Sequence, residues 1–179
     1  MILDDLKRLS QDHAILPFKC GDTDLENFLN DDAKAHGEAL LSVTYLMEKD
    51  NLTIAFFSLF NDKIGYNEIN SHRKFEKIFK AKLPKSKWFK SYPSVKIGRF
   101  GVHQNYQNEG VGGKILDFIK GWFIDNNKTG CMYITVDAYK RSLPFYSKNG
   151  FLFLTDDDVD SDTRLMYFDL TLLKNSLIN

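Results

Sequence analysis

The spacing of apolar residues divides the first part of the chain into a helix and two strands. Asp22 is a suitable N-cap, and the apolar residues after it recur at helical spacing, which predicts a helix that ends near Gly37. Two stretches rich in β-branched and aromatic residues follow at 41–48 and 52–60, with a short polar turn between them. This pattern predicts an antiparallel hairpin.

The second half of the chain predicts a strand–helix–strand unit. Residues 95–102 have the composition of a strand, and residues 110–124 repeat apolar positions with a helical period. A second strand is predicted at 131–136, so the two strands are expected to run parallel with a right-handed crossover. The remaining predicted elements are one short helix and two strands, at 143–148, 151–154 and 164–170. The predicted fold class is therefore mixed α and β (α+β).

Charge is segregated along the chain, although 24 Lys and Arg residues balance 24 Asp and Glu residues. Residues 1–62 hold 5 basic against 12 acidic side chains, residues 63–99 hold 11 against 2, and residues 100–179 hold 8 against 10. The neutral total argues against a uniformly basic nucleic-acid binder. Because the length fits one domain and no linker is evident, we predict a single domain, 1–179, with a basic insert at about 63–94.

The composition excludes several classes of protein. Apolar residues make up 43% of the chain and charged residues 27%, which is typical of a globular domain with a buried core. No uncharged run approaches the roughly 18–20 residues that a membrane helix needs, and acidic residues stand where a signal peptide carries positive charge. Only Cys20 and Cys131 are present, with no neighbouring Cys or paired His. We therefore expect a cytoplasmic protein with structural thiols and without membrane insertion.

A glycine-bearing loop connects the strand at 95–102 to the helix that follows. Unpaired backbone amides and the positive end of the helix dipole favour a phosphate at such a helix start. Gly110, Gly112 and Gly113 allow a ligand to approach the backbone closely. The loop lacks the Walker and dinucleotide fingerprints, so nucleoside triphosphates and NAD are weaker candidates. Glycines at such turns also serve packing, and the loop alone leaves both roles open.

Two ordered motifs resemble those of the GCN5-related N-acetyltransferases (GNAT). Gln107-Asn-Glu-Gly-Val-Gly112, after a strand, is similar to the family motif Q/R-x-x-G-x-G/A. Pro144-Phe-Tyr-Ser-Lys-Asn-Gly-Phe151 is similar to its second landmark, F/L-Y-x-K-x-G-F. The resemblance covers most of the chain. Other stretches resemble the subgroup that includes toxins of toxin–antitoxin pairs, among them Phe18-Lys-Cys-Gly21, Leu25-Glu-Asn-Phe28-Leu29 and Gly98-Arg-Phe-Gly-Val102.

This resemblance implies a central twisted mixed sheet with flanking helices and a splayed pair of parallel strands that admits acetyl-CoA. The pantetheine arm is expected to pair with the strand edge at Phe100, Gly101 and Val102. The residues expected to hold the pyrophosphate on their backbone amides are Gln107, Asn108, Glu109, Gly110, Val111, Gly112 and Gly113. Because the neutral Gln107 replaces the more common Arg, the backbone must supply more of the binding.

Tyr146 matches the family tyrosine that protonates the departing CoA thiolate. A phenol with a pKa of about 10 can donate to a thiolate whose parent thiol has a pKa near 8.5, given suitable geometry. The structural alternative for Tyr146 is a core aromatic whose hydroxyl bonds a backbone carbonyl. The strand-end amide near Val102 is a candidate oxyanion donor. His103 and water are candidate bases, with a surface position as the alternative for His103. Asp137 is a candidate contact for the substrate ammonium, with a cap of the following helix as the alternative.

No metal is predicted. The aspartate-rich stretch at 156–162 lacks the glycine and terminal glutamate of a calcium loop, so we interpret it as a solvated hairpin loop. The basic insert predicts a short helix at 72–82 in which lysines alternate with aromatic residues. That pattern is typical of an RNA-binding surface, but also of a solvated helix over core aromatics. The residues concerned include Lys74, Lys77, Lys80, Phe75 and Phe79.

The predicted function is transfer of an acetyl group from acetyl-CoA to a primary amine by direct attack, with Tyr146 as the general acid. One alternative is a toxin-type enzyme that acts on aminoacyl-tRNA, and another is a non-catalytic module that binds acetyl-CoA or nucleic acid. The acceptor is a small molecule, a peptide or an aminoacyl-tRNA. An antitoxin partner and a homodimer are left open.

Overall fold

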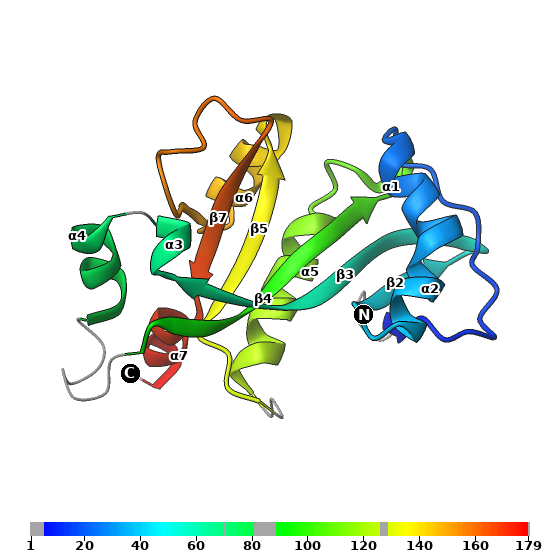
Figure 1. The fold of residues 1–179 in the computed structure, drawn as a ribbon. Helices are drawn as coiled ribbons and strands as arrows, with labels where there is room; N and C mark the ends of the chain where they lie inside the picture. Colours follow the sequence, from blue (N-terminus) through cyan, green and yellow to red (C-terminus); the bar gives the residue numbers. More distant parts are fainter. Residues whose placement is uncertain (1–5, 70, 81–88, 126–128, 179) are drawn as a thin grey trace. The chain divides into compact units, whose positions relative to one another are not determined.

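The computed structural model describes residues 6–69, 71–80, 89–125 and 129–178 (Figure 1). The chain forms two compact units, each built from two stretches of sequence. Unit 1 contains Met1–Asn61 and Ile97–Trp122, and unit 2 contains Asp62–Lys96 and Phe123–Asn179. The two longest strands contribute to both units. The single domain expected from the sequence stays a prediction.

Among the described residues, seven strands form a sheet in the order β1-β2-β3-β4-β5-β7-β6. Their bounds are Leu6–Arg8 (β1), Val43–Lys49 (β2), Leu52–Gly65 (β3), Ser91–Val102 (β4), Tyr133–Tyr139 (β5), Leu152–Phe153 (β6) and Thr163–Asp169 (β7). Strands β4 and β5 pair in parallel, from Ser94 opposite Tyr133 to Lys96 opposite Thr135, whereas β2–β3 and β5–β7 are antiparallel. The mixed sheet confirms the expected fold class. The splaying of the parallel pair stays a prediction.

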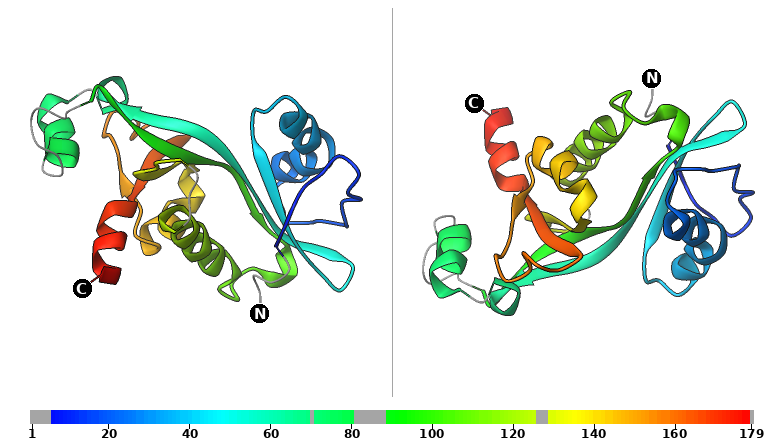
Figure 2. Two further views of the ribbon diagram at one scale, coloured as in Figure 1. Left: turned by 90° about the horizontal axis from the view of Figure 1, so that it is seen from below. Right: turned by 90° about the horizontal axis from the view of Figure 1, so that it is seen from above.

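The helix predicted after Asp22 is present in three segments: α1 (Thr23–Asn27), a π-helical turn η1 (Phe28–Asp32) and α2 (Ala33–Glu38). The Asp22 carboxylate accepts hydrogen bonds from the backbone N–H groups of Asp24 and Leu25, which caps the helix start. Phe28 packs in the core of this side of the sheet. In Figure 2, α1 and α2 lie on one side of β3 and β4, and α5 (Val111–Ile124) lies on the other.

The predicted hairpin is formed by β2 and β3. Asp50 and Asn51 both have positive φ, and this two-residue turn joins the paired residues Lys49 and Leu52. The register shifts after Met47, because Met47 lies opposite Ala55 and the next residue lies opposite Thr53. Strand β3 runs to Gly65, past the predicted end at 60. The polar residues after position 60 suggested an end, but the strand continues beyond them to Ile64, whose side chain is buried.

The predicted helix of the basic insert is confirmed as far as the structure describes it. It consists of α4 (His72–Phe75) and a π-helical turn η2 (Glu76–Lys80), preceded by α3 (Tyr66–Ile69), and residues 81–88 lie outside the described part of the chain. Phe79 stacks on Tyr92 at a ring separation of 4.2 Å and meets Tyr133 edge-on at 5.3 Å. These rings form the core of unit 2.

The C-terminal helix α7 (Leu170–Ile178) was not predicted. The carboxylate of Asp169 accepts hydrogen bonds from the backbone N–H groups of Thr171 and Leu172, as in a helix N-cap. The backbone N–H of Leu170 also donates to the carbonyl of Met132 at 3.0 Å, which fixes the helix start beside β5. An aspartate directly before an apolar run was the sequence signal for this helix.

Candidate active site

In unit 1, β4 ends in a loop that leads into α5. The loop contains a 3₁₀ turn, η4 (Gln104–Tyr106), and two residues with positive φ, Asn108 at 64° and Gly110 at 79°. The first helical bond of α5 runs from the N–H of Lys114 to the carbonyl of Gly110, at 3.1 Å. The N–H groups of residues 111–113 precede this bond, so the helix itself does not use them. They are suitable donors for a phosphate.

The side chain of Gln107 turns back into the protein. Its Nε2 donates to the carbonyl of Cys20 at 2.8 Å and to the carbonyl of Val102 at 3.0 Å. A primary amide has two N–H donors, so both are committed to the protein. The side chain of Gln107 therefore has no donor left for a phosphate, and the backbone of the loop must supply the phosphate contacts.

Two glycines near the end of β4 make room for aromatic rings. A Cβ on Gly101 would lie 2.9 Å from the Cζ of Phe18 and 2.9 Å from the Cε1 of Phe56, and a Cβ on Gly98 would overlap the ring of Phe60. Phe56 and Phe60 are four residues apart on β3 and share a face, whereas Gly98 and Gly101 are three apart. The regular alternation of β4 is therefore interrupted between the two glycines. The expected pantetheine edge, Phe100 to Val102, lies at this irregularity.

Tyr146 lies in unit 2 on the short helix α6 (Leu143–Lys148). Gly150 follows with φ of 82°, its N–H donates to the carbonyl of Ser147 at 3.0 Å, and the N–H of Phe151 donates to the carbonyl of Tyr146 at 3.1 Å. These two bonds form a Schellman motif, and the rings of Tyr146 and Phe151 pack 5.3 Å apart. The spacing Y-x-x-x-G-F of the second motif is thus the geometry of a helix C-terminus.

The environment of Tyr146 keeps its hydroxyl protonated. The residue is 5% exposed, and burial raises its pKa well above the usual value for tyrosine. Within the part of the chain that the structure describes, the hydroxyl makes no hydrogen bond, so the alternative of a bond to a backbone carbonyl finds no support there. The raised pKa keeps the phenol in the protonated form that a general acid needs, and it also makes the phenol a weaker acid than an exposed tyrosine.

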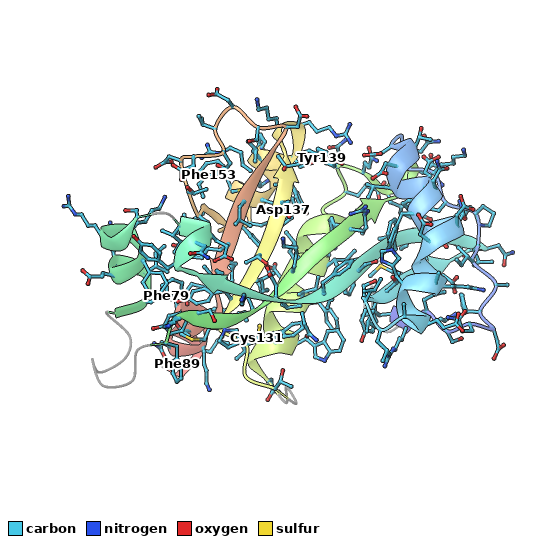
Figure 3. The ribbon with its side chains drawn as sticks, in the orientation of Figure 1. Phe79, Phe89, Cys131, Asp137, Tyr139 and Phe153 are labelled. Carbon is cyan, nitrogen blue, oxygen red and sulfur yellow. The ribbon has the colours of Figure 1, made fainter. Side chains whose placement is uncertain are left out.

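His103 and Asp137 have partners that the sequence did not indicate. His103 is buried rather than on the surface, and its Nδ1 accepts the N–H of Asn105 at 3.2 Å. Asp137, labelled on β5 in Figure 3, forms an ion pair with Lys96 at 2.8 Å. The 3₁₀ turn η5 (Lys140–Ser142) that follows β5 has Tyr139 at its N-cap, without a side-chain bond. Asp137 therefore does not cap it, and its contact with a substrate ammonium stays a prediction. His103 is not assigned as the base.

The aspartate-rich hairpin is organised by an arginine. Asp158 accepts a hydrogen bond from Arg164 Nε at 3.0 Å and one from the N–H of Leu165 at 2.6 Å. The Arg164 guanidinium lies 4.0 Å from the ring centre of Phe153, which Figure 3 labels.

No cluster of three or more potential metal ligands occurs among the described residues. Burial raises the pKa of the Cys131 thiol to about 11, so this cysteine is a poor nucleophile.

The aromatic residues of the basic insert are divided between core and surface. Phe75 and Phe79 are buried, so they are not available to stack on bases, whereas Phe89 is 62% exposed. Arg73 and Lys77 are exposed on the same helical segment. The segment is therefore a solvated helix over core aromatics that still presents cations.

The residues expected at the site divide between the two units. All ten expected cofactor-binding residues lie in unit 1, and Tyr146 lies in unit 2. The sequence reasoning missed the partners of Gln107, although the segment around Cys20 carried one of the quoted resemblances. No helix in the described part of the chain is long and apolar enough to cross a membrane.

Comparison with known proteins identifies the family. Residues 43–152 match the family model described as an acetyltransferase (GNAT) domain, so the chain belongs to the GNAT acetyltransferases. It is accordingly an acetyl-CoA-dependent N-acetyltransferase, with acetyl-CoA as its co-substrate. No curated protein matches the chain by sequence.

Solved structures of bacterial toxins share the fold. AtaT complexed with acetyl-methionyl-tRNAfMet is 18% identical with a TM-score of 0.75, over 96% of this chain and 98% of that chain. AtaTR bound with AcCoA is 19% identical with a TM-score of 0.73, over 98% and 99%. A structure described as a bacterial toxin is 14% identical with a TM-score of 0.76, over 97% and 94%. These similarities confirm the expected fold over nearly the whole chain.

Proposed function

We propose that this acetyltransferase is a toxin-type enzyme that acetylates the amino group of an aminoacyl-tRNA. The observation that carries the proposal is the similarity to AtaT complexed with acetyl-methionyl-tRNAfMet, which extends over 96% of this chain. Because this cover leaves few residues unmatched, the similarity includes most of the first 42 residues, which lie outside the matched family domain. A small amine or a peptide is the competing acceptor.

The reaction requires a neutral amine, stabilisation of the carbonyl oxygen and a proton for the leaving sulfur. The amine nitrogen attacks the thioester carbonyl, the C–N bond forms, the C–S bond breaks, and the nitrogen gives up its proton to water. The strand-end amide near Val102 is the proposed donor to the oxyanion. Tyr146 gives its proton to the thiolate and regains one from solvent. Because burial raises its pKa, Tyr146 is protonated at the start of every cycle.

The pyrophosphate of acetyl-CoA is assigned to the loop in unit 1. The supporting geometry is the run of N–H groups at 111–113 that precede the first bond of α5, together with the positive φ of Gly110. Glu109 and Asn108 are exposed in the same loop, and the contribution assigned to them is through their backbone. The pantetheine is assigned to the edge of β4 from Phe100 to Val102.

The exposed cations of the basic insert are the proposed contact for RNA phosphates. Arg73 and Lys77 are exposed on α4 and η2, and Lys90 is exposed just before β4. Contacts of this kind predict an affinity for tRNA that falls with salt, by about 0.7–0.9 in log K per log unit of salt for each phosphate. Arg73 and Lys77 changed to Ala should reduce that slope, with Lys49 changed to Ala as a surface control.

An antitoxin partner is proposed on the same basis as the acceptor. Structures similar to this chain include AtaT bound to the C-terminus of the antitoxin AtaR, at 16% identity over 94% of this chain. Co-expression with the product of a neighbouring gene, followed by co-purification, tests for such a partner. Analytical ultracentrifugation of the purified chain tests whether it forms a homodimer.

The deciding experiment is acetylation of charged tRNA. The protein is incubated with labelled acetyl-CoA and methionyl-tRNA or a mixed aminoacyl-tRNA pool, and the N-acetylated aminoacyl group is measured after hydrolysis of the ester. Uncharged tRNA and the Tyr146→Phe variant are the controls. Label on the aminoacyl group supports the proposal. If acetyl-CoA binds and no aminoacyl-tRNA is acetylated, the acceptor assignment is wrong, and amines and peptides are the next substrates to test.

A further inference from the structure

The stretch that contains Phe18-Lys-Cys-Gly21 has no role in the mechanism above, yet it is tightly bonded within unit 1. The Oε1 of Glu26, on α1, accepts the backbone N–H of Cys20 at 2.8 Å and that of Gly21 at 3.0 Å. The Nζ of Lys19 also lies 3.2 Å from the other carboxylate oxygen of Glu26. Gly21 has φ of 82°, so the chain turns sharply here toward the N-cap of α1. One carboxylate thus fastens this segment to the helix.

The same segment is bonded to the strands and to the loop that follows β4. The carbonyl of Pro17 accepts the N–H of Thr53 at 3.1 Å, and the carbonyl of Lys19 accepts the N–H of Gln104 at 2.7 Å. The carbonyl of Cys20 accepts Gln107 Nε2 at 2.8 Å. These bonds attach the start of the segment to β3 and its end to the loop that follows β4.

Gln107 joins this segment to the end of β4. Its amide nitrogen donates to Cys20 and Val102, residues that are 82 positions apart in sequence. Phe18 lies next to the end of β4, where a Cβ on Gly101 would touch its ring. The amide of Gln107 and the contact between Phe18 and Gly101 therefore fix the direction in which the loop leaves β4.

We propose that residues 17–21 form a buttress that sets the position of the phosphate-binding loop, and that Gln107 and Glu26 are positioning residues for acetyl-CoA. The proposal rests on the assignment of the pyrophosphate to the loop at 107–113. It gives the N-terminal stretch a function: the stretch holds the backbone donors of the loop in place. Gln107 acts here through the backbone and not through a contact of its own with phosphate.

The test compares two acetyl donors. Dissociation constants are measured for acetyl-CoA and for S-acetylpantetheine, which lacks the pyrophosphate and the nucleotide, with the full-length chain. The variants are Gln107→Met, which keeps the side-chain length without the donors, and Glu26→Ala. The matched controls are Gln104→Ala in the same loop and Glu38→Ala in α2, because both residues are exposed.

Acetyl-CoA should bind about ten-fold more weakly to Gln107→Met, since two hydrogen bonds that fix the loop are lost. The dissociation constant of S-acetylpantetheine should not change, and the two controls should match the wild type for both donors.

Three results would overturn the proposal. If Gln107→Met binds acetyl-CoA like the wild type, the loop does not depend on the buttress. If both donors weaken equally, the substitution disturbs the fold as a whole and Gln107 is not a positioning residue for the phosphates. If the wild type binds both donors equally well, the pyrophosphate does not bind this loop, and the assignment on which the buttress rests is wrong.

Discussion

The loop after β4 in unit 1 and the end of α6 in unit 2 each carry a family motif, and they use their residues in opposite ways. In the loop, the proposed working groups are backbone N–H donors, and the side chain of Gln107 is bonded to the protein. In α6, the backbone bonds of Gly150 and Phe151 close the helix, and the side chain of Tyr146 is the proposed working group. Substitutions in the two motifs should therefore fail in different steps.

This difference separates binding from chemistry. A change that bends the loop backbone moves the donors for phosphate, so it is expected to weaken acetyl-CoA binding. A change at the hydroxyl of Tyr146 leaves the backbone of α6 intact, so it is expected to lower turnover. Substitutions at single residues of the two motifs test this division.

The largest effect is expected for Tyr146→Phe. Loss of a general acid typically lowers a rate by about 10²–10⁴-fold, so turnover should fall by that order. The dissociation constant of acetyl-CoA and the free energy of unfolding should change little, since the ring and its contact with Phe151 are kept. Steady-state kinetics with a charged tRNA acceptor and calorimetric titration of acetyl-CoA measure both effects. Unchanged turnover would remove Tyr146 from the mechanism.

The next effect is expected for Gly101→Ala at the end of β4. The added Cβ would meet the rings of Phe18 and Phe56 at 2.9 Å, and crowding of this kind costs about 1–3 kcal/mol of the free energy of unfolding. Gly121→Ala on α5 is the matched control, because no atom lies within 4 Å of its added Cβ. That control should stabilise the protein by about 0.5–1 kcal/mol. Urea unfolding that ranks the two variants equally would contradict the packing seen at Gly101.

A pair of smaller effects compares the two motifs directly. Gly110→Ala and Gly150→Ala both place an alanine at positive φ, which costs about 1–2 kcal/mol of the free energy of unfolding. Only Gly150 also has a close neighbour, the Cε2 of Phe168 at 3.1 Å from the added Cβ. Gly110→Ala should weaken acetyl-CoA binding, and Gly150→Ala should lower turnover because it loosens the helix end that holds Tyr146. Equal effects of both variants on binding would refute the division between the motifs.

The elements with a strong local pattern could be predicted from the sequence. The N-cap at Asp22, the polar turn before Leu52 and the apolar period of α5 each determine their structure within a few residues. The extension of β3 to Gly65 and the helix α7 were missed, since the first crosses polar residues and the second begins at an aspartate inside a predicted strand end. The extension of β3 and the position of α7 depend on which of their side chains the rest of the folded chain buries.

The two sequence motifs reach only part of the candidate site, whose residue assignments stay predictions. The turn at Gly110 and the buried Tyr146 lie within these motifs. The bond from Gln107 to Cys20 joins residues that are 87 positions apart, so no local pattern indicates it. For the basic insert, the sequence left two interpretations open, and the structure supports the solvated helix over core aromatics, because Phe75 and Phe79 are buried while Arg73 stays exposed.

The smallest effect is expected at Glu26, where acid should weaken the buttress. The hydrogen bonds from the N–H groups of Cys20 and Gly21 lower the pKa of the Glu26 carboxyl from its usual value of 4.5. A carboxylate whose pKa is lowered in the folded state stabilises that state above the unfolded pKa, and this contribution is lost as pH falls through the folded pKa. The difference in unfolding free energy between wild type and Glu26→Gln should therefore be largest near neutral pH and shrink below about pH 4.5. Glu38→Gln gives the baseline for the loss of one surface carboxylate. Urea unfolding from pH 3 to pH 7 measures the difference, and parallel curves for wild type and Glu26→Gln would show that the carboxylate does not hold the Cys20–Gly21 turn.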